Sequence, residues 1–323
     1  MAKMNMRDAL RDALHEEMAR DETIFVLGED VIMHGGPYAI TRGIAEKFPG
    51  RIRQTPISEA GIVGTAVGAA LCGMRPVAEI MYVDFITCAM DEVVNQMAKV
   101  RYMFGGQTDV PVVLRLPSGT ARLIAAQHSQ CLESWFTHIP GLQVVIPSTP
   151  YDAKGLMKTA LRGKDPVIFI EYKRLYMDEG EVPEEYYTVP FGQADIKREG
   201  SDLTIVATGG MVSKALQAAD ILAGEGVSVE VADPRTLFPL DKETIFASVR
   251  KTNRVIVTDE EVQRGGSSAE LAALIAEACF DDLDGPVKRV ASKDVPMPFS
   301  PELEKLVVPT ADTLVEAARE LMG

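Results

Sequence analysis

Short apolar runs of strand length alternate along the chain with longer segments of helical periodicity. Residues 110–116 are almost continuously apolar, which is typical of a strand buried on both faces of a sheet. This alternation predicts an α/β fold whose parallel sheets are covered by helices on both faces. Strands are expected near residues 24–27, 51–55, 76–80, 110–116, 143–146, 167–172, 203–207, 227–232, 254–258 and 287–290. Helices are expected near residues 5–20, 42–48, 85–103, 151–162, 212–225, 242–250, 268–278 and 310–322, and a further helix is expected to begin near Glu59 and to end before Gly73.

A chain of 323 residues exceeds the size at which one hydrophobic core usually stops growing, so two domains are expected. Residues 178–190 contain many acids and two prolines and have no periodicity, which is typical of a linker. The predicted organisation is an N-terminal parallel-sheet domain over residues 1–180, a linker over 181–198 and a C-terminal α/β domain over 199–323.

The stretch 54–73 contains a single charged side chain, Glu59, followed by glycines within an apolar run. Ser58 is a good helix N-cap, and Glu59 would then lie in the first turn, where a carboxylate favours the positive end of the helix dipole. Each glycine costs roughly 1 kcal/mol inside a helix, which predicts close approach of another backbone or a ligand. The stretch is therefore either a capped core helix or a carboxylate held toward a ligand at the mouth of a tightly packed helix.

Composition limits the classes of partner. The chain has 33 basic and 47 acidic residues and a net charge of −14, which argues against nucleic acid and anionic membranes as partners and is compatible with a basic protein partner.

The four cysteines have no CxxC spacing, which indicates free thiols in a reducing compartment. The acidic N-terminus does not resemble a targeting peptide, and the apolar run 60–73 is too short to cross a bilayer. A cytoplasmic, soluble protein is expected.

Two further patterns leave alternatives open. The run 203–207 leads into Gly209 and Gly210, but the third glycine of a dinucleotide-binding fingerprint is missing, so an ordinary turn explains them better. His128 lies in the polar patch AAQHSQ, inside a long non-repetitive segment over residues 117–140. It is either a hydrogen-bonded loop histidine or a group that moves protons near neutral pH. The run 118–120, Ser-Gly-Thr, could also hold an anion.

Several stretches together resemble one family. The runs LGEDV, TPISEAGIVGTAVGAALCGMRPVAEIM, RYMFGG, AAQHSQ, HIPGLQVVIPSTPYDAKGL and DPRTLFPLD look like the beta subunit of the thiamine diphosphate-dependent first component of 2-oxo acid dehydrogenase complexes. Among members of that family, YMFGG, AAQHSQ and HIPGLQVV are most similar to pyruvate and acetoin dehydrogenase beta subunits. The resemblance covers the whole chain, and it implies a pyrimidine-binding N-terminal domain and a transketolase-like C-terminal domain.

The resemblance also implies roles for individual residues. Glu59 matches the glutamate that hydrogen-bonds the cofactor's aminopyrimidine and stabilises the imino tautomer that deprotonates the thiazolium carbon. Phe85 matches the aromatic residue stacked on the pyrimidine, and Ile57 and Met81 match apolar neighbours. His128 matches the active-site histidine that transfers protons or orients lipoamide.

A structural potassium ion is the third implication of the resemblance. The matching positions, which would contribute mainly backbone carbonyls, are Val112, Ala160, Leu161, Gly163 and Asp165. The run ALRGKDP reads as a helix C-terminus, whose last carbonyls carry partial negative charge and suit a cation.

Partners follow from what the chain lacks. Enzymes that use this cofactor hold Mg²⁺ and diphosphate with a GDG motif, and this sequence contains none. The resemblance therefore implies that an alpha subunit holds Mg²⁺ and that the two subunits share the cofactor in an α₂β₂ heterotetramer. It also implies a dihydrolipoyl acyltransferase core with lipoyl domains as a partner, docked through the acidic surface.

The expected function is that of a beta subunit of pyruvate dehydrogenase, with oxidative decarboxylation and acyl transfer to lipoyllysine. Acetoin dehydrogenase and then branched-chain 2-oxo acid dehydrogenase beta subunits are the alternatives. A non-catalytic scaffold subunit and a transketolase-like transferase fragment are the rivals of a different class.

Overall fold

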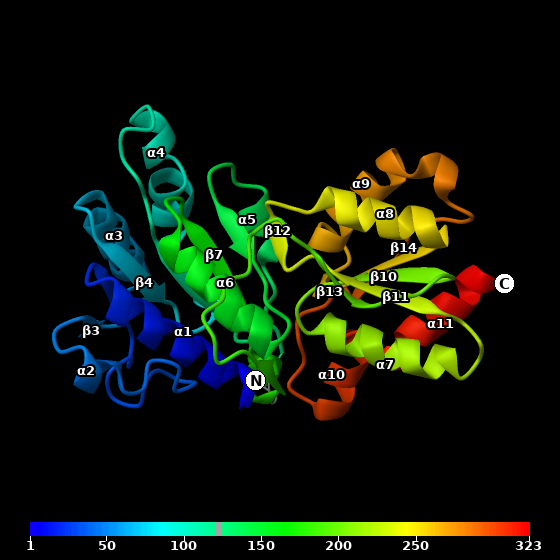
Figure 1. The fold of residues 1–323 in the computed structure, drawn as a ribbon, viewed down its shortest axis with the longest axis horizontal. Helices are drawn as coiled ribbons and strands as arrows, with labels where there is room; N and C mark the ends of the chain where they lie inside the picture. The colour runs from blue at the N-terminus through cyan, green and yellow to red at the C-terminus, as the bar shows by residue number, and fades with distance from the viewer. Residues whose placement is uncertain (121–123) are drawn as a thin grey trace. The chain divides into compact units, whose positions relative to one another are not determined.

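The computed structural model describes residues 1–120 and 124–323, and it divides into two compact units. The first unit consists of Met1–Ser118 and Trp135–Phe191, and the second of Gly119–Ser134 and Gly192–Gly323. Both are α/β units built around a predominantly parallel sheet, as the alternating pattern predicted (Figure 1). In the described part of the chain, no helix is both long and apolar enough to span a bilayer.

The first unit contains six parallel strands in the spatial order β6-β7-β5-β4-β2-β3. They are β2 (Ile24–Gly28), β3 (Ile52–Gln54), β4 (Arg75–Glu79), β5 (Val113–Ser118), β6 (Gln143–Val145) and β7 (Val167–Tyr172). The central strands β5 and β7 are buried along their whole length, which fits their continuous apolar sequence.

Helices cover this sheet on both faces. The helical segments are α1 (Met6–Arg20), α2 (Ile44–Lys47), α3 (Glu59–Leu71), η1 (Val83–Ala89), η2 (Glu92–Met97), α4 (Val100–Met103), α5 (Glu133–Thr137), α6 (Pro150–Arg162) and η3 (Lys173–Met177). Helices α1 and α6 pack side by side (Figure 1), whereas α3 packs against β4, η1 and η2.

The segment near residues 85–103 was predicted as one long helix, and the structure corrects this prediction. It consists of the 3₁₀ helix η1, the π-helix η2 and the short helix α4. Its buried apolar residues include Val83, Ile86, Ala89, Val93 and Met97, at intervals of three and four residues. Intervals of three and four residues also fit an α-helix, which repeats every 3.6 residues, so the apolar pattern alone did not distinguish these windings.

The predicted linker over residues 181–198 also differs from the structure, which divides the units between Phe191 and Gly192. Strand β8 (Glu179–Val182) pairs antiparallel with β1 (Ala2–Asn5), and neither strand was anticipated. Further along, the ring of Tyr187 stacks on Tyr151 at 4.7 Å between centroids. The acids of this stretch point to solvent while Val182 and Val189 are buried, so its polar composition concealed an ordered segment.

The second unit has a five-stranded sheet in the order β14-β13-β10-β11-β9. The strands are β9 (Asp195–Arg198), β10 (Leu203–Ala207), β11 (Val229–Asp233), β13 (Val255–Val262) and β14 (Lys288–Ser292). The short strand β12 (Thr236–Phe238) follows β11 in the chain and is not part of this sheet. All pairs are parallel except that of β9, which is an antiparallel edge strand.

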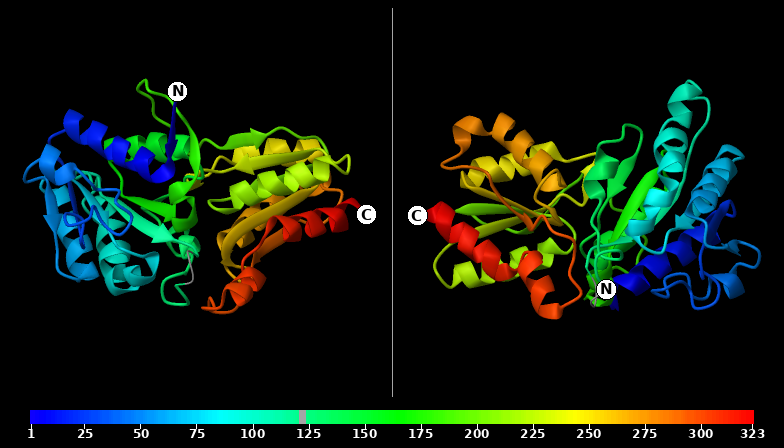
Figure 2. Two further views of the ribbon diagram at one scale, coloured as in Figure 1. Left: turned by 90° about the horizontal axis from the view of Figure 1, so that it is seen from below. Right: turned by 180° about the vertical axis from the view of Figure 1, so that it is seen from behind.

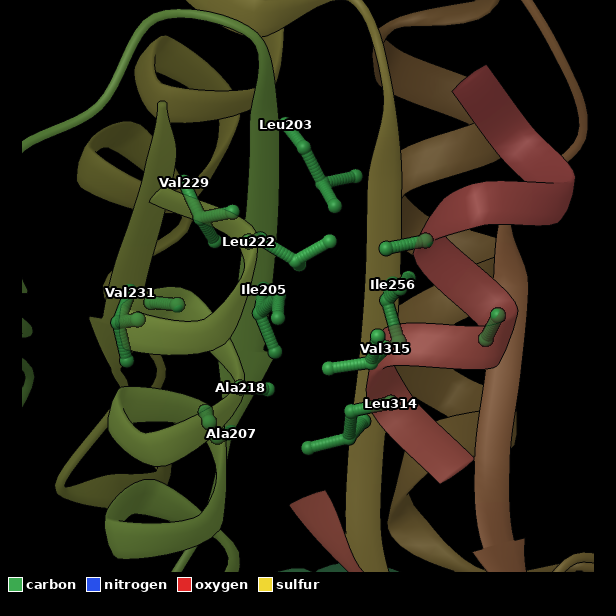
Figure 3. Packing of buried hydrophobic residues seen from close by; sticks show 14 of the residues in the cluster. Leu203, Ile205, Ala207, Ala218, Leu222, Val229, Val231, Ile256, Leu314 and Val315 are labelled. Atoms are coloured by element: carbon green, nitrogen blue, oxygen red, sulfur yellow. The ribbon is translucent and has the colours of Figure 1, made fainter. Parts of the chain in front are cut away.

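Two pairs of helices cover the faces of this second sheet, with α7 and α11 on one face and α8 and α9 on the other (Figures 1 and 2). The helical segments are α7 (Met211–Ala223), α8 (Lys242–Thr252), α9 (Ser267–Ala278), η4 (Phe280–Asp282), α10 (Pro301–Val307) and α11 (Ala311–Met322). Figure 3 shows the core between the sheet and the first pair, where Leu314 and Val315 face Ile205 and Ile256.

Candidate functional site

Glu59 is the first residue of α3, as predicted, and it lies just beyond the carboxyl ends of the parallel strands of the first unit. Ser58 occupies the N-cap position, but its hydroxyl makes no capping hydrogen bond, contrary to the prediction. A Cβ atom on Gly61 would lie 2.8 Å from the Ser58 Oγ atom, so a larger residue at position 61 would require the Ser58 hydroxyl to move. The half-buried Glu59 carboxylate makes no hydrogen bond or ion pair among residues 1–120 and 124–323. It is therefore available to a ligand.

A second carboxylate, which sequence reasoning did not single out, lies close to Glu59. Glu29 follows β2 directly and is 9% exposed. Burial raises the pKa of its carboxyl group, and repulsion from Glu59 and then from Asp30 raises it further. The signal available in the sequence was its place in the run LGEDV, immediately after a strand, because polar groups that follow parallel strands gather at one edge of the sheet.

The three apolar residues predicted at this site lie on neighbouring segments. Ile57 precedes α3 and is 80% exposed, Met81 follows β4 and Phe85 lies within η1, which packs against α3. The ring of Tyr82 meets Phe85 edge-on, with centroids 6.0 Å apart. A free carboxylate and a half-buried aromatic ring on two helical segments that pack together suit a flat heteroaromatic ring that has hydrogen-bond donors. The residues of this chain thus fit the pyrimidine half of the predicted cofactor.

A buried network of charged side chains joins strands β4, β5 and β7 of this sheet. The Arg115 guanidinium donates two hydrogen bonds of 2.7 Å to Glu171 and a further one to Glu79. The hydroxyl of Tyr176 donates to Glu171 at 2.7 Å. Arg115 and Glu171 are fully buried, and burial raises the pKa of Glu79. The two carboxylates share one guanidinium, which makes Arg115 the cation on which the network depends.

This network also contacts the loop that carries Glu29. A Cβ atom on Gly36 would lie 2.6 Å from Glu79 Oε1, and the positive φ of 76° at this residue also favours glycine. In the same loop, the Tyr38 ring packs on Tyr176 with centroids 4.6 Å apart. The loop is therefore held by side chains of strand β4 and of the segment η3.

His128 is half-buried and belongs to the part of the chain that groups with the second unit. Its backbone N–H donates to the carbonyl of Ala125 at 3.4 Å, and Gly119 N–H donates to the Gln130 carbonyl at 3.1 Å. The segment 119–134, of which residues 119–120 and 124–134 are described, is therefore closed by a local backbone contact. Its role remains the prediction made from the resemblance. Ser118 and Thr120, the candidate anion site, are buried.

The residues predicted to hold potassium gather at the C-terminal end of α6. The carbonyls of Leu161 and Gly163 both accept hydrogen bonds from the Arg75 guanidinium, at 3.2 and 2.7 Å. Two more carbonyls already accept backbone N–H groups: Ala160 from Gly163 and Val112 from Val167. The side chain of Asp165 pairs with Arg101. Carbonyl oxygens at a helix C-terminus suit a cation, and here Arg75 already supplies part of that charge.

The carboxylates, histidines and cysteines of residues 1–120 and 124–323 form no cluster of three or more that could hold a metal ion.

The glycine face of α3 meets little within this chain. A Cβ atom on Gly68 would meet nothing within 4 Å, and one on Gly64 would meet only Glu92 Cγ at 3.7 Å. Within residues 1–120 and 124–323, no backbone makes the close approach to Gly64 and Gly68 that the sequence led us to expect. The face is open to another molecule.

Comparison with known families covers both units. Residues 2–179 match the pyrimidine-binding domain of transketolase, and residues 192–314 match the transketolase C-terminal domain. A solved structure titled split gene transketolase, inactive beta4 tetramer, has a TM-score of 0.80, with 26% sequence identity and 98% of each chain covered.

Curated relatives match the chain over nearly its whole length. The beta subunit of acetoin:2,6-dichlorophenolindophenol oxidoreductase from Bacillus subtilis is 48% identical over 99% of this chain and 97% of its own length. The pyruvate dehydrogenase E1 component subunit beta of Rickettsia felis is 46% identical, with 99% and 98% covered. The 2-oxoisovalerate dehydrogenase subunit beta of Bacillus subtilis is 45% identical, with 99% of both chains covered. The three sequence identities are nearly equal, so they do not indicate which of the three substrates this chain's enzyme uses.

Proposed function

Because this chain belongs to the family of beta subunits of 2-oxo acid dehydrogenase E1 components, we propose that it is the beta half of a pyruvate dehydrogenase E1 enzyme. The proposed reaction is the oxidative decarboxylation of pyruvate with transfer of the acetyl group to lipoyllysine. The observation that carries this proposal is the unpaired Glu59 carboxylate at the edge of the sheet, beside an aromatic face, in a domain of the pyrimidine-binding family.

Each site residue has a proposed role toward thiamine diphosphate. When bound, this cofactor supplies the nucleophilic carbon and the electron sink that decarboxylation needs. Glu59 would accept a hydrogen bond from the pyrimidine ring of the bound cofactor, and Phe85 would stack against that ring. Ile57 and Met81 exclude water around the ring, because their side chains are apolar and border the same edge of the sheet. His128 holds or moves a proton near the substrate or orients the lipoyl group.

The remaining half of the site belongs to a proposed alpha subunit, which would hold Mg²⁺ and the diphosphate in an α₂β₂ heterotetramer. This assignment is supported by the missing GDG motif and by the open glycine face of α3. We further propose a cytoplasmic location and docking of the acyltransferase core on the acidic surface of this chain. Docking of that kind should weaken as salt is raised, and binding that ignores salt would contradict it.

Coexpression with a cognate alpha chain tests the function directly. Purified α₂β₂ protein would be assayed for lipoamide reduction with pyruvate, acetoin, branched-chain 2-oxo acids and a ketose donor. Turnover of pyruvate above the others would support the proposal. A cofactor-loaded tetramer that turns over no 2-oxo acid and no acetoin would contradict it, and ketose transfer would favour the transferase alternative.

Acetoin is the second candidate substrate. The observation in its favour is the 48% identity to an acetoin oxidoreductase beta subunit, which is slightly above that to pyruvate dehydrogenase subunits. The same panel of substrates decides between the two.

Substitution of Gly64 by leucine is expected to impair assembly with the alpha chain before it unfolds this one. The side chain would project from the open face of α3, where a Cβ atom meets only an ordinary contact within the chain. Replacing a helix glycine is favourable by up to about 1 kcal/mol, so the isolated chain should remain stable. Size-exclusion chromatography with light scattering measures assembly, and Gln217→Leu on the exposed side of α7 is the matched control. A normal Gly64→Leu tetramer would contradict the proposed interface.

We also propose that the end of α6 binds K⁺ through carbonyls of Val112, Ala160, Leu161 and Gly163, with Asp165 beside them. Oxygen donors at a helix C-terminus support this, and the carbonyls shared with Arg75 each retain a second lone pair. The melting temperature of the tetramer should be higher in KCl than in NaCl at equal ionic strength. Equal melting temperatures would rule out a specific potassium site.

A further inference from the structure

Two buried carboxylates lie two residues apart on β13, at the start of α9. Asp259 is 1% exposed and Glu261 is 2% exposed. Asp259 Oδ2 accepts hydrogen bonds from the Ser268 N–H at 2.6 Å and from the Ser267 hydroxyl at 3.0 Å. Glu261 Oε2 accepts from the Ser267 N–H at 2.7 Å. Both carboxylates thus bind the first N–H groups of α9, which lack partners within the helix.

The backbone is packed tightly around this pair. A Cβ atom on Gly266 would lie 2.7 Å from the Val262 carbonyl oxygen and 3.0 Å from Glu261 Cβ. The turn between β13 and α9 therefore requires glycine at this position. The arrangement leaves the carboxylates little freedom to move away from the helix.

Glu261 makes one contact that Asp259 does not. Its second oxygen, Oε1, accepts a hydrogen bond of 3.0 Å from the backbone N–H of Ser134. In the described part of the chain, all hydrogen bonds of Asp259 go to the start of α9. One carboxylate therefore joins the start of α9 to the end of the segment 119–134, and the other does not.

Ser134 lies six residues after His128, in the first turn of the short helix α5. An N–H in a first helical turn has no partner within its own helix, and a carboxylate satisfies it with a charge-assisted hydrogen bond. Leu132 and Ser129 are buried between the two positions. Fixing Ser134 thus restricts the chain that leads to His128.

Stability alone does not explain this pair. Burial and then repulsion from Glu261 raise the pKa of Asp259 from 3.8 to about 7. Between pH 3.8 and about 7, the Asp259 carboxyl group is protonated in the folded chain and ionised in the unfolded chain. The free energy of unfolding therefore falls as the pH rises through this range. Above pH 7 Asp259 carries a buried negative charge, which disfavours folding.

We propose that Glu261 is a positioning residue for His128, holding the segment 119–134 in place through Ser134 while it anchors the start of α9. This inference rests on the proposed function for the role of His128. The anchoring itself is a property of this chain and can be measured without any reaction.

Hydrogen–deuterium exchange of the reconstituted α₂β₂ protein tests the anchoring. Glu261→Ala should raise the exchange rate of peptides covering residues 124–134 by tenfold or more. Glu261→Gln should raise it less, because the amide oxygen can still accept one of the two N–H groups. Asp259→Asn is the matched control: it is equally buried, contacts the same end of α9 and should leave the exchange of residues 124–134 unchanged.

Turnover supplies the second measurement. Glu261→Ala should lower kcat about tenfold and leave KM for the 2-oxo acid within about twofold of the wild-type value. Glu261→Gln should recover part of the lost kcat. Asp259→Asn should keep kcat within about twofold of the wild-type value. Unchanged exchange in Glu261→Ala, or an equal rise in Asp259→Asn, would overturn the inference. Increased exchange with unchanged kcat would also overturn it, because the segment would then be anchored without consequence for the reaction. A wild-type tetramer without turnover would instead refute the proposed function, and the exchange rates would still decide whether Glu261 holds the segment.

Discussion

Glu59→Gln is expected to lower turnover of the reconstituted tetramer by about 10²- to 10⁴-fold, the range typical of a lost proton-transfer group. Glutamine has nearly the same shape, so α3 should form and the subunits should assemble. What is lost is the negative charge at a half-buried position whose carboxylate makes no bond within the described chain. A neutral amide cannot favour the protonated ring that the proposed role requires.

The measurement is steady-state lipoamide reduction at saturating cofactor, with assembly checked by light scattering. Glu46→Gln is the matched control, because Glu46 is an exposed glutamate in the first turn of another helix, α2, and it should leave turnover unchanged. Full activity of Glu59→Gln in an intact tetramer would favour the scaffold interpretation over the catalytic one.

Arg115→Met is expected to destabilise the first unit by about 3–5 kcal/mol, the usual result of breaking a buried ion pair from one side. Its guanidinium is fully buried between Glu79 and Glu171, and removing it leaves two carboxylates together without a cation. The melting temperature should fall by roughly 10 °C for a unit of this size.

Thermal and urea unfolding of the isolated chain measure this effect. Arg264→Met is the control, because the Arg264 side chain is 82% exposed in its pair with Asp294, and such pairs contribute at most about 1 kcal/mol. Adding Glu79→Gln to Arg115→Met should recover part of the loss, since one of the two unpaired charges is then removed. Equal stability of Arg115→Met and the wild type would mean that the network is not the support inferred from its contacts.

Local patterns predicted most of the secondary structure because the core strands are short, continuous and apolar. The expected strands at residues 167–172 and 203–207 coincide with β7 and β10. The strands β1 and β8 were missed because each depends on its partner: neither has an apolar pattern of its own, and only their pairing makes them strands. The broken helix near residues 85–103 was missed because its apolar residues recur at intervals of three and four, which an α-helix also shows.

The sequence by itself determined the α/β class, the position of Glu59 at the start of a helix and, through whole-length resemblance, the family. These features depend on residues close together in the chain or on patterns that short stretches carry. Only the tertiary structure brought Glu29 beside Glu59, joined Glu79, Arg115 and Glu171, and connected Glu261 with Ser134. The physical reason is that charges and hydrogen bonds act over a few ångströms in space, and in these cases the chain separates the groups by 30, 36, 56 and 127 positions.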